Sequence, residues 1–183
     1  YNLISKETSN KISEGIQKYA ALIENEYGDE VLKQFLQHLK DRMPTKDEFR
    51  KTFKLIGYSN HCEYYRDIKN KQKAEMALSI LEQIKSRRSD VPNFTIEHIL
   101  PDSQDRKNAM IGNLIPLEED LNSSCEDKLL DEKFPIYERS NFVTARNISN
   151  RYKNNVDGFK IDSRGDVMAD ELYNEIGRIL HTL

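Results

Sequence analysis

Two short apolar runs, at residues 94–100 and 111–117, interrupt a chain that is otherwise patterned for helices. Before these runs, apolar residues recur every three or four positions, as they do at Val31, Leu32, Phe35, Leu36 and Leu39. Pro92 and Pro101 bound the first run, and proline disfavours a helix there because it lacks the backbone donor. The two runs therefore predict a short hairpin, and the polar residues from Glu118 onward predict a helix directly after it.

This pattern predicts an α+β fold that is mostly α and that divides into three stretches. Residues 1–92 are expected to form a helical lobe, in which Thr45 and Glu48 have the spacing of a capping box. Residues 93–133 are expected to form a small ββα core, and residues 134–183 a helical C-terminal extension that packs on this core. The three stretches are expected to make one compact unit.

Composition argues against a membrane protein and against a disulfide-rich secreted one. The chain has no apolar run near the roughly 18 residues that span a bilayer, and no secretory segment. Its two cysteines, Cys62 and Cys125, lie far apart without the spacing of a zinc ribbon. We therefore expect reduced thiols, a cytoplasmic location and no membrane partner. Because the sequence begins at Tyr1 rather than Met, we also expect it to be a C-terminal fragment of a longer protein.

The net charge of −3 does not by itself indicate a nucleic-acid binder, but its distribution along the chain is uneven. An acidic stretch at residues 97–132, able to hold a cation, is followed at residues 133–164 by a basic one, able to hold phosphates. Solvated helical faces also produce such runs. The candidates for phosphate contact in nucleic-acid binding are Lys133, Arg139, Arg146, Arg151 and Arg164.

The residues that can carry chemistry are concentrated around the predicted hairpin. Glu97 directly precedes His98, Asn113 follows fifteen residues later, and Asn122 follows nine residues after that. Hydrolysis of a phosphodiester needs a base that takes a proton from water, and imidazole, with an ordinary pKa of about 6.5, suits this task at neutral pH. A hard divalent cation, Mg²⁺ or Mn²⁺, offsets the charge that builds on the phosphate oxygens.

These residue types indicate a role for each of the four positions. His98 is predicted to be the general base, and Glu97 and Asn122 the two protein ligands of one cation, because Mg²⁺ prefers oxygen ligands and retains several waters. Adjacent residues of a strand point to opposite faces, so Glu97 and His98 share a site only if the strand ends or bends there, and Pro101 favours such an end. Asn113 is expected to hydrogen-bond the loop behind His98 and to fix the imidazole. The alternatives are that His98 is only structural and that Asn122 caps a helix.

The strings EHILP, IGNLIPL and LN resemble the HNH-like His-Me finger nucleases, whose ββα-metal core carries an acid–histidine pair on its first strand. More narrowly, residues 74–169 resemble the C-terminal nuclease domain of GmrSD-type modification-dependent restriction proteins and the similar domain of phosphorothioate-sensing SspE. The resemblance implies that His98 is the base, that Glu97 and Asn122 bind the metal, and that Asn113 organises the loop. Many His-Me fingers have aspartate at the position of Glu97, whose longer side chain changes the reach of the ligand.

The resemblance implies a metal-dependent HNH-type endonuclease that nicks or cuts double-stranded DNA in defence against foreign or modified DNA. It implies one Mg²⁺ or Mn²⁺ ion, and a ParB-like nucleotide hydrolase domain before this one in the full-length protein. Two other functions stay open. A catalytically silent module that binds DNA or protein would share the fold, and an RNase would share the metal centre, because that centre acts on the phosphodiester and not on the sugar.

Overall fold

A computed structural model describes residues 10–25 and 28–182, so residues 1–9 of the predicted N-terminal lobe lie outside the described ranges. The helices are α1 (Asn10–Asn25), α2 (Asp29–Lys40), α3 (Lys46–Phe53), α4 (Ile68–Ser86), α5 (Glu119–Cys125), α6 (Leu130–Glu138), α7 (Val143–Tyr152) and α8 (Ile161–Thr182). The strands are β1 (Thr95–His98) and β2 (Leu114–Leu117). The described chain is thus α+β and mostly α, as the sequence predicts. In these ranges no helix is both long and apolar enough to cross a bilayer.

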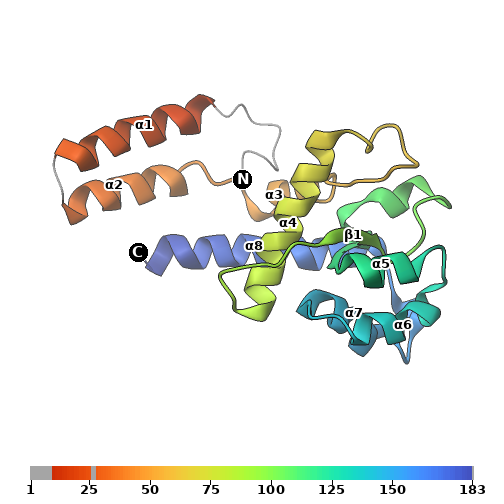
Figure 1. The fold of residues 1–183 in the computed structure, drawn as a ribbon. Helices are drawn as coiled ribbons and strands as arrows, with labels where there is room; N and C mark the ends of the chain where they lie inside the picture. The colour runs from red at the N-terminus through yellow and green to blue at the C-terminus, as the bar shows by residue number, and fades with distance from the viewer. Residues whose placement is uncertain (1–9, 26–27, 183) are drawn as a thin grey trace.

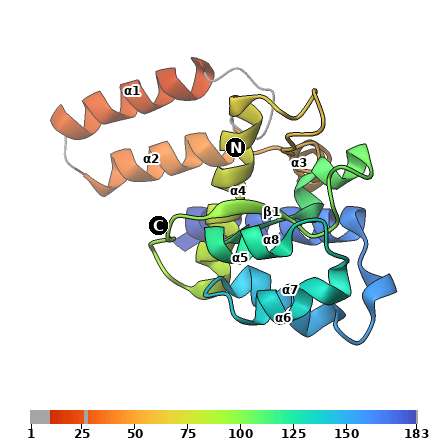
Figure 2. The same ribbon diagram turned by 45° about the vertical axis from the view of Figure 1, so that its right-hand side comes forward.

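The long helix α8 is the element on which much of the molecule packs. Helices α3 and α4 contact it, as does the 3-10 turn Ile111–Asn113 that leads into β2. Helices α1 and α2 pair with each other on one side of the molecule, and α5, α6 and α7 lie on the other (Figure 1, Figure 2).

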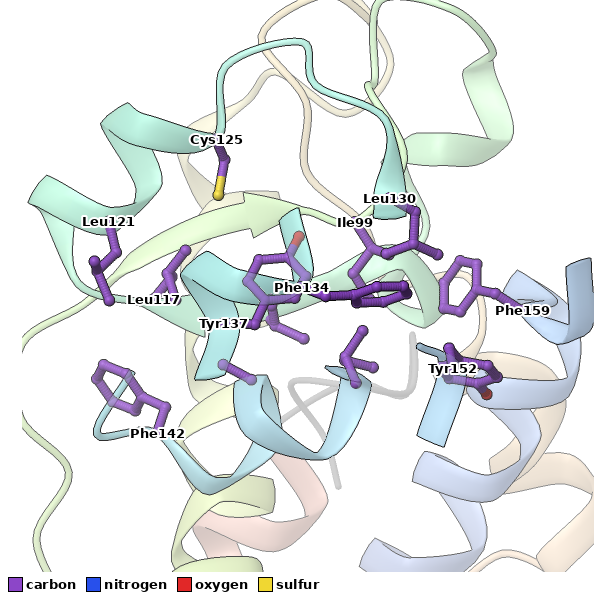
Figure 3. Close-up of a cluster of buried hydrophobic side chains, with 13 residues drawn as sticks. Ile99, Leu117, Leu121, Cys125, Leu130, Phe134, Tyr137, Phe142, Tyr152 and Phe159 are labelled. Carbon is purple, nitrogen blue, oxygen red and sulfur yellow. The ribbon is translucent and has the colours of Figure 1, made fainter. Parts of the chain in front are cut away.

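Both faces of β2 are buried, which explains why residues 111–117 form an almost continuous apolar run. On one face, Ile115 and Leu117 pack with side chains of α5, α6 and α7, and Figure 3 shows Tyr137 and Phe134 of α6 in this cluster. On the other face, Leu114 packs with side chains of α3, α4 and α8. All four residues of β2 are buried. A strand covered on both sides needs no polar alternation.

The predicted capping box at the start of α3 is confirmed. Thr45 Oγ1 accepts the backbone N–H of Glu48 at 3.3 Å, and the Thr45 N–H donates to Glu48 Oε2 at 2.9 Å. This reciprocal pair satisfies backbone donors that the first turn of a helix otherwise leaves without partners.

A short segment beside Gly57 extends the hairpin by a few backbone contacts. Ile56 O accepts the N–H of Ile111 at 2.8 Å, and the Tyr58 N–H donates to Ala109 O at 2.9 Å. A Cβ at Gly57 would lie 2.4 Å from Ala109 O, so this close approach requires glycine. The segment brings the backbone of Tyr58 to the end of β1.

Candidate active site

The candidate site begins where β1 ends. β1 pairs antiparallel with β2, with Glu97 opposite Ile115 and His98 opposite Leu114. His98 is the last residue of β1, but it is still in register with β2. Adjacent strand residues point to opposite faces. As a result, Glu97 and His98 contact different groups of residues, and the structure does not bring their side chains into one site.

His98 is held by one ring nitrogen. Its Nε2 lies 2.8 Å from the backbone carbonyl oxygen of Tyr58. A carbonyl oxygen can only accept, so Nε2 carries the proton and donates it to Tyr58 O. In the neutral imidazole the lone pair then resides on Nδ1. The side chain is 15% exposed, so the ring lies at the edge of the fold rather than inside it.

Asp102 is the carboxylate nearest to the His98 ring. Its Oδ2 lies 3.7 Å from His98 Nε2, and its Oδ1 lies 4.0 Å from His61 Nε2. Ser59 Oγ donates a hydrogen bond to Asp102 Oδ2 at 2.6 Å. The same Ser59 oxygen accepts the backbone N–H groups of His61 and Cys62, which fixes the loop around the carboxylate.

Glu97 lies on the other face and is almost fully buried. Its Oε1 accepts two hydrogen bonds of 2.8 Å, one from Lys133 Nζ and one from the Tyr137 hydroxyl, both on α6. Lys133 Nζ also donates to His98 O at 2.7 Å. Burial, followed by the nearby charge of Glu97, raises the pKa of Tyr137 well above its usual value and that of Cys125 to about 12. This network joins α6 to the end of β1.

Asn122 and Asn113 hold the backbone on either side of His98. Asn122 of α5 donates through Nδ2 to Thr95 Oγ1 at 2.7 Å and to Ile96 O at 3.1 Å. Asn113 is fully buried; its Oδ1 accepts the N–H of Leu100 at 2.9 Å. Its Nδ2 donates to two backbone oxygens at 2.7 Å, those of Leu100 and Asn108. Asn113 therefore organises the loop that follows His98.

The five basic candidates for phosphate contact are divided between interior and surface. Lys133 is 1% exposed and uses its ammonium on Glu97 and His98, so the expectation that it contacts DNA is corrected here. Arg164 Nη1 donates to Gly112 O and Leu114 O at 2.9 and 3.0 Å, and Arg146 Nη1 donates to Ser140 O. The side chains that stand at the surface are those of Arg139 and Arg151.

The predicted metal ligands do not form a cation site in this arrangement. Glu97 faces the ammonium of Lys133, which already compensates its charge, and Asn122 turns its amide nitrogen toward β1. Among the described residues, no three histidine, cysteine, aspartate or glutamate side chains gather to hold a metal ion. The donor set therefore does not fit the Mg²⁺ or Mn²⁺ that the sequence predicts, and we assign no chemical step to a metal.

Sequence reasoning did not find the groups that contact His98 across the chain. Tyr58, which contacts His98, and Ser59, which contacts Asp102, lie about forty positions before their partners, and no motif connects them to the hairpin. One available signal was Asp102, a carboxylate four residues after His98 and directly after Pro101. The sequence predicts Lys133 as a phosphate contact, whereas in the structure it is the partner of Glu97.

The comparison with protein families finds a match over most of the chain. The model of the family described as GmrSD restriction endonucleases, C-terminal domain, matches residues 28–171, which is most of the chain. No curated protein and no solved structure matches it.

Proposed function

The chain belongs to the family of GmrSD restriction endonuclease C-terminal domains, and we propose that it hydrolyses DNA phosphodiester bonds with His98 as the general base. The family supplies the reaction class, that of a restriction endonuclease. The observation that carries the role of His98 is its hydrogen bond from Nε2 to Tyr58 O, which leaves the Nδ1 lone pair for a proton. We also propose that β1, β2 and α5 correspond to the ββα core of a His-Me finger nuclease, since they follow one another in that order.

In the proposed reaction, Nδ1 of His98 takes a proton from a water molecule as the water oxygen attacks phosphorus. The bond from phosphorus to the 3′ oxygen breaks, and that oxygen takes a proton from solvent, which gives a 5′-phosphate and a 3′-hydroxyl. The ring becomes positively charged in this step. Asp102, with Oδ2 3.7 Å from Nε2, offsets that charge, and the carbonyl of Tyr58 keeps the ring oriented. Asp102 is therefore a positioning and charge-compensating residue in this proposal.

Three other side chains around β1 support the base rather than react. Asn113 fixes the loop after His98 through three hydrogen bonds, and Lys133 binds the carbonyl of His98 from the opposite face. Asn122 ties α5 to β1. A general base must be held within a fraction of an ångström of its working position, and these contacts supply that precision.

A requirement for one divalent cation, Mg²⁺ or Mn²⁺, is also proposed, and it rests only on the resemblance to His-Me finger nucleases. The surroundings of Glu97 do not support that residue as a ligand. Cleavage is therefore to be measured with Mg²⁺, with Mn²⁺ and with EDTA. Undiminished cleavage in EDTA would remove the metal from the proposal and leave the role of His98 standing.

Plasmid nicking by the wild type, His98→Ala and His38→Ala tests the proposed function. His38 lies on α2, where it contacts Arg42 and Tyr19, and serves as the matched histidine control. We expect His98→Ala to lower the rate by about 10²–10⁴-fold, the usual contribution of a general base, and His38→Ala to leave it near that of the wild type.

The other outcomes select among the remaining functions. Equal nicking by the wild type and His98→Ala would contradict the assignment of the base. If neither protein cleaves DNA but both retain DNA binding, the domain is a silent binding module. If the wild type cleaves RNA in preference to DNA and loses that activity with His98→Ala, the core acts as an RNase.

A further inference from the structure

A cavity of about 360 Å³ lies between α4, α7 and α8, away from the groups that contact His98. Its volume falls in the range of about 300–1000 Å³ that is usual for small-molecule sites. Leu78 and Leu81 of α4, Ile148 of α7 and Met168 of α8 form apolar walls, and all four are buried. Walls of this kind accept a flat, largely apolar group such as a ring system.

Two arginines give the same cavity a positive charge. Arg151 of α7 is exposed at its rim, with its guanidinium 5.6 Å from the centre of the Tyr152 ring. Arg164 of α8 lines it from inside. Among the described residues, the only carboxylate that lines it is that of Glu171, which pairs with Lys85. Lys85, Arg151 and Arg164 thus line the cavity together with one carboxylate, which leaves the cavity with an excess of positive charge.

Of the two arginines, Arg164 says more about what the cavity binds, because its guanidinium group is largely shielded from solvent. Its Nη1 is used by the carbonyls of Gly112 and Leu114, which leaves Nε and Nη2 as donors for another acceptor. In the described residues, no carboxylate lies within ion-pair distance of it. Burial lowers the pKa of Arg164 to about 10, so the group stays charged at neutral pH at a cost in solvation. An anion in the cavity would offset that cost.

We propose that this cavity binds a nucleotide, with the phosphate on Arg151 and Arg164 and the base between the apolar walls. A guanidinium group matches phosphate oxygens with paired donors, and a base has the flat apolar faces that the walls accept. Asn147, at the exposed edge of the cavity, supplies an amide that donates to and accepts from the polar edge of a base. The nucleotide can come from solution or from a nucleic-acid strand, since both present the same base and phosphate.

The test is a calorimetric titration of the whole chain in EDTA with deoxyadenosine and deoxycytidine 5′-monophosphates, and with deoxyadenosine and inorganic phosphate separately. The chain carries His98→Ala so that binding is measured without cleavage and does not depend on the proposed function. We expect both nucleotides to bind saturably, and each half-ligand to bind at least about ten-fold more weakly, because each makes only part of the contacts.

Three variants decide where the nucleotide binds. Arg151→Gln should weaken binding by at least about ten-fold through loss of one charge-assisted pair, and Val167→Phe should do so by filling the cavity from its exposed rim. Arg66→Gln, which removes an exposed arginine that does not line the cavity, should leave the affinity unchanged.

Competition with a short single-stranded oligonucleotide then shows whether the cavity takes a free nucleotide or one that belongs to a strand. If it displaces the bound nucleotide, the cavity takes a nucleotide of a strand; if it does not, the cavity takes the free nucleotide. The proposal is overturned if neither monophosphate binds in the millimolar range, or if Arg151→Gln and Val167→Phe both bind as tightly as Arg66→Gln.

Discussion

Replacing Lys133 by methionine tests the buried network that joins α6 to the end of β1. The side chains of Lys133 and Glu97 are 1% and 6% exposed, so the carboxylate left behind has almost no access to water. Removal of one partner of a buried ion pair costs about 3–5 kcal/mol, because the remaining charge is uncompensated. We therefore expect Lys133→Met to lower the free energy of unfolding by about that amount. The double variant Glu97→Gln/Lys133→Met should recover a large part of the loss, because it no longer buries a lone charge.

Urea denaturation at neutral pH, followed by circular dichroism, measures these differences. Lys153→Met is the matched control, because the ion pair of Lys153 with Glu138 has both side chains 47% exposed. An exposed pair contributes about 0–1 kcal/mol. The reasoning is refuted if Lys133→Met lowers the free energy of unfolding no more than Lys153→Met does. It is also refuted if Glu97→Gln lowers that free energy as much in the Lys133→Met background as it does in the wild type.

Three further predictions concern other parts of the fold. The raised pKa of Cys125, about 12 against an ordinary 9, keeps it a thiol up to strongly alkaline pH, so a thiol reagent at pH 8 should label Cys62 in the native protein and Cys125 only after denaturation. Asn113→Ala should lower the free energy of unfolding by about 2–5 kcal/mol in urea denaturation, since it leaves buried backbone groups without partners; a loss below about 1 kcal/mol would contradict this. Gly112→Ala should lower the melting temperature, because the added Cβ would lie 2.1 Å from Ile161 O; an unchanged melting temperature would show that α8 shifts freely.

The hairpin was predictable from the sequence because its signals are local. Pro92 and Pro101 bound the first run, and the structure forms β1 within it. The second run was predicted at residues 111–117, but its first three residues form a 3-10 turn and only Leu114–Leu117 are strand. The capping box at Thr45 was predictable for the same reason, since both of its partners lie within one helical turn.

The environment of the site was not predictable, because its contacts join distant parts of the chain. The partners of Glu97 lie 36 and 40 positions later, and the serine that holds Asp102 lies 43 positions earlier. Residue types and spacing indicated a histidine beside a carboxylate, but not which carboxylate faces the ring. Strand alternation gave the correct warning that Glu97 and His98 point apart. The register of β1 with β2 then places Glu97 in the interior.

The most direct test of the central claim is the rescue of His98→Ala by added imidazole in the plasmid nicking assay. A free imidazole can occupy the space of the lost ring and accept the proton that Nδ1 would take. The account predicts that nicking by His98→Ala is slower than that of the wild type by about 10²–10⁴-fold and rises with the concentration of unprotonated imidazole. Nicking by His98→Ala at the wild-type rate, with no response to imidazole, would contradict the assignment of His98 as the base.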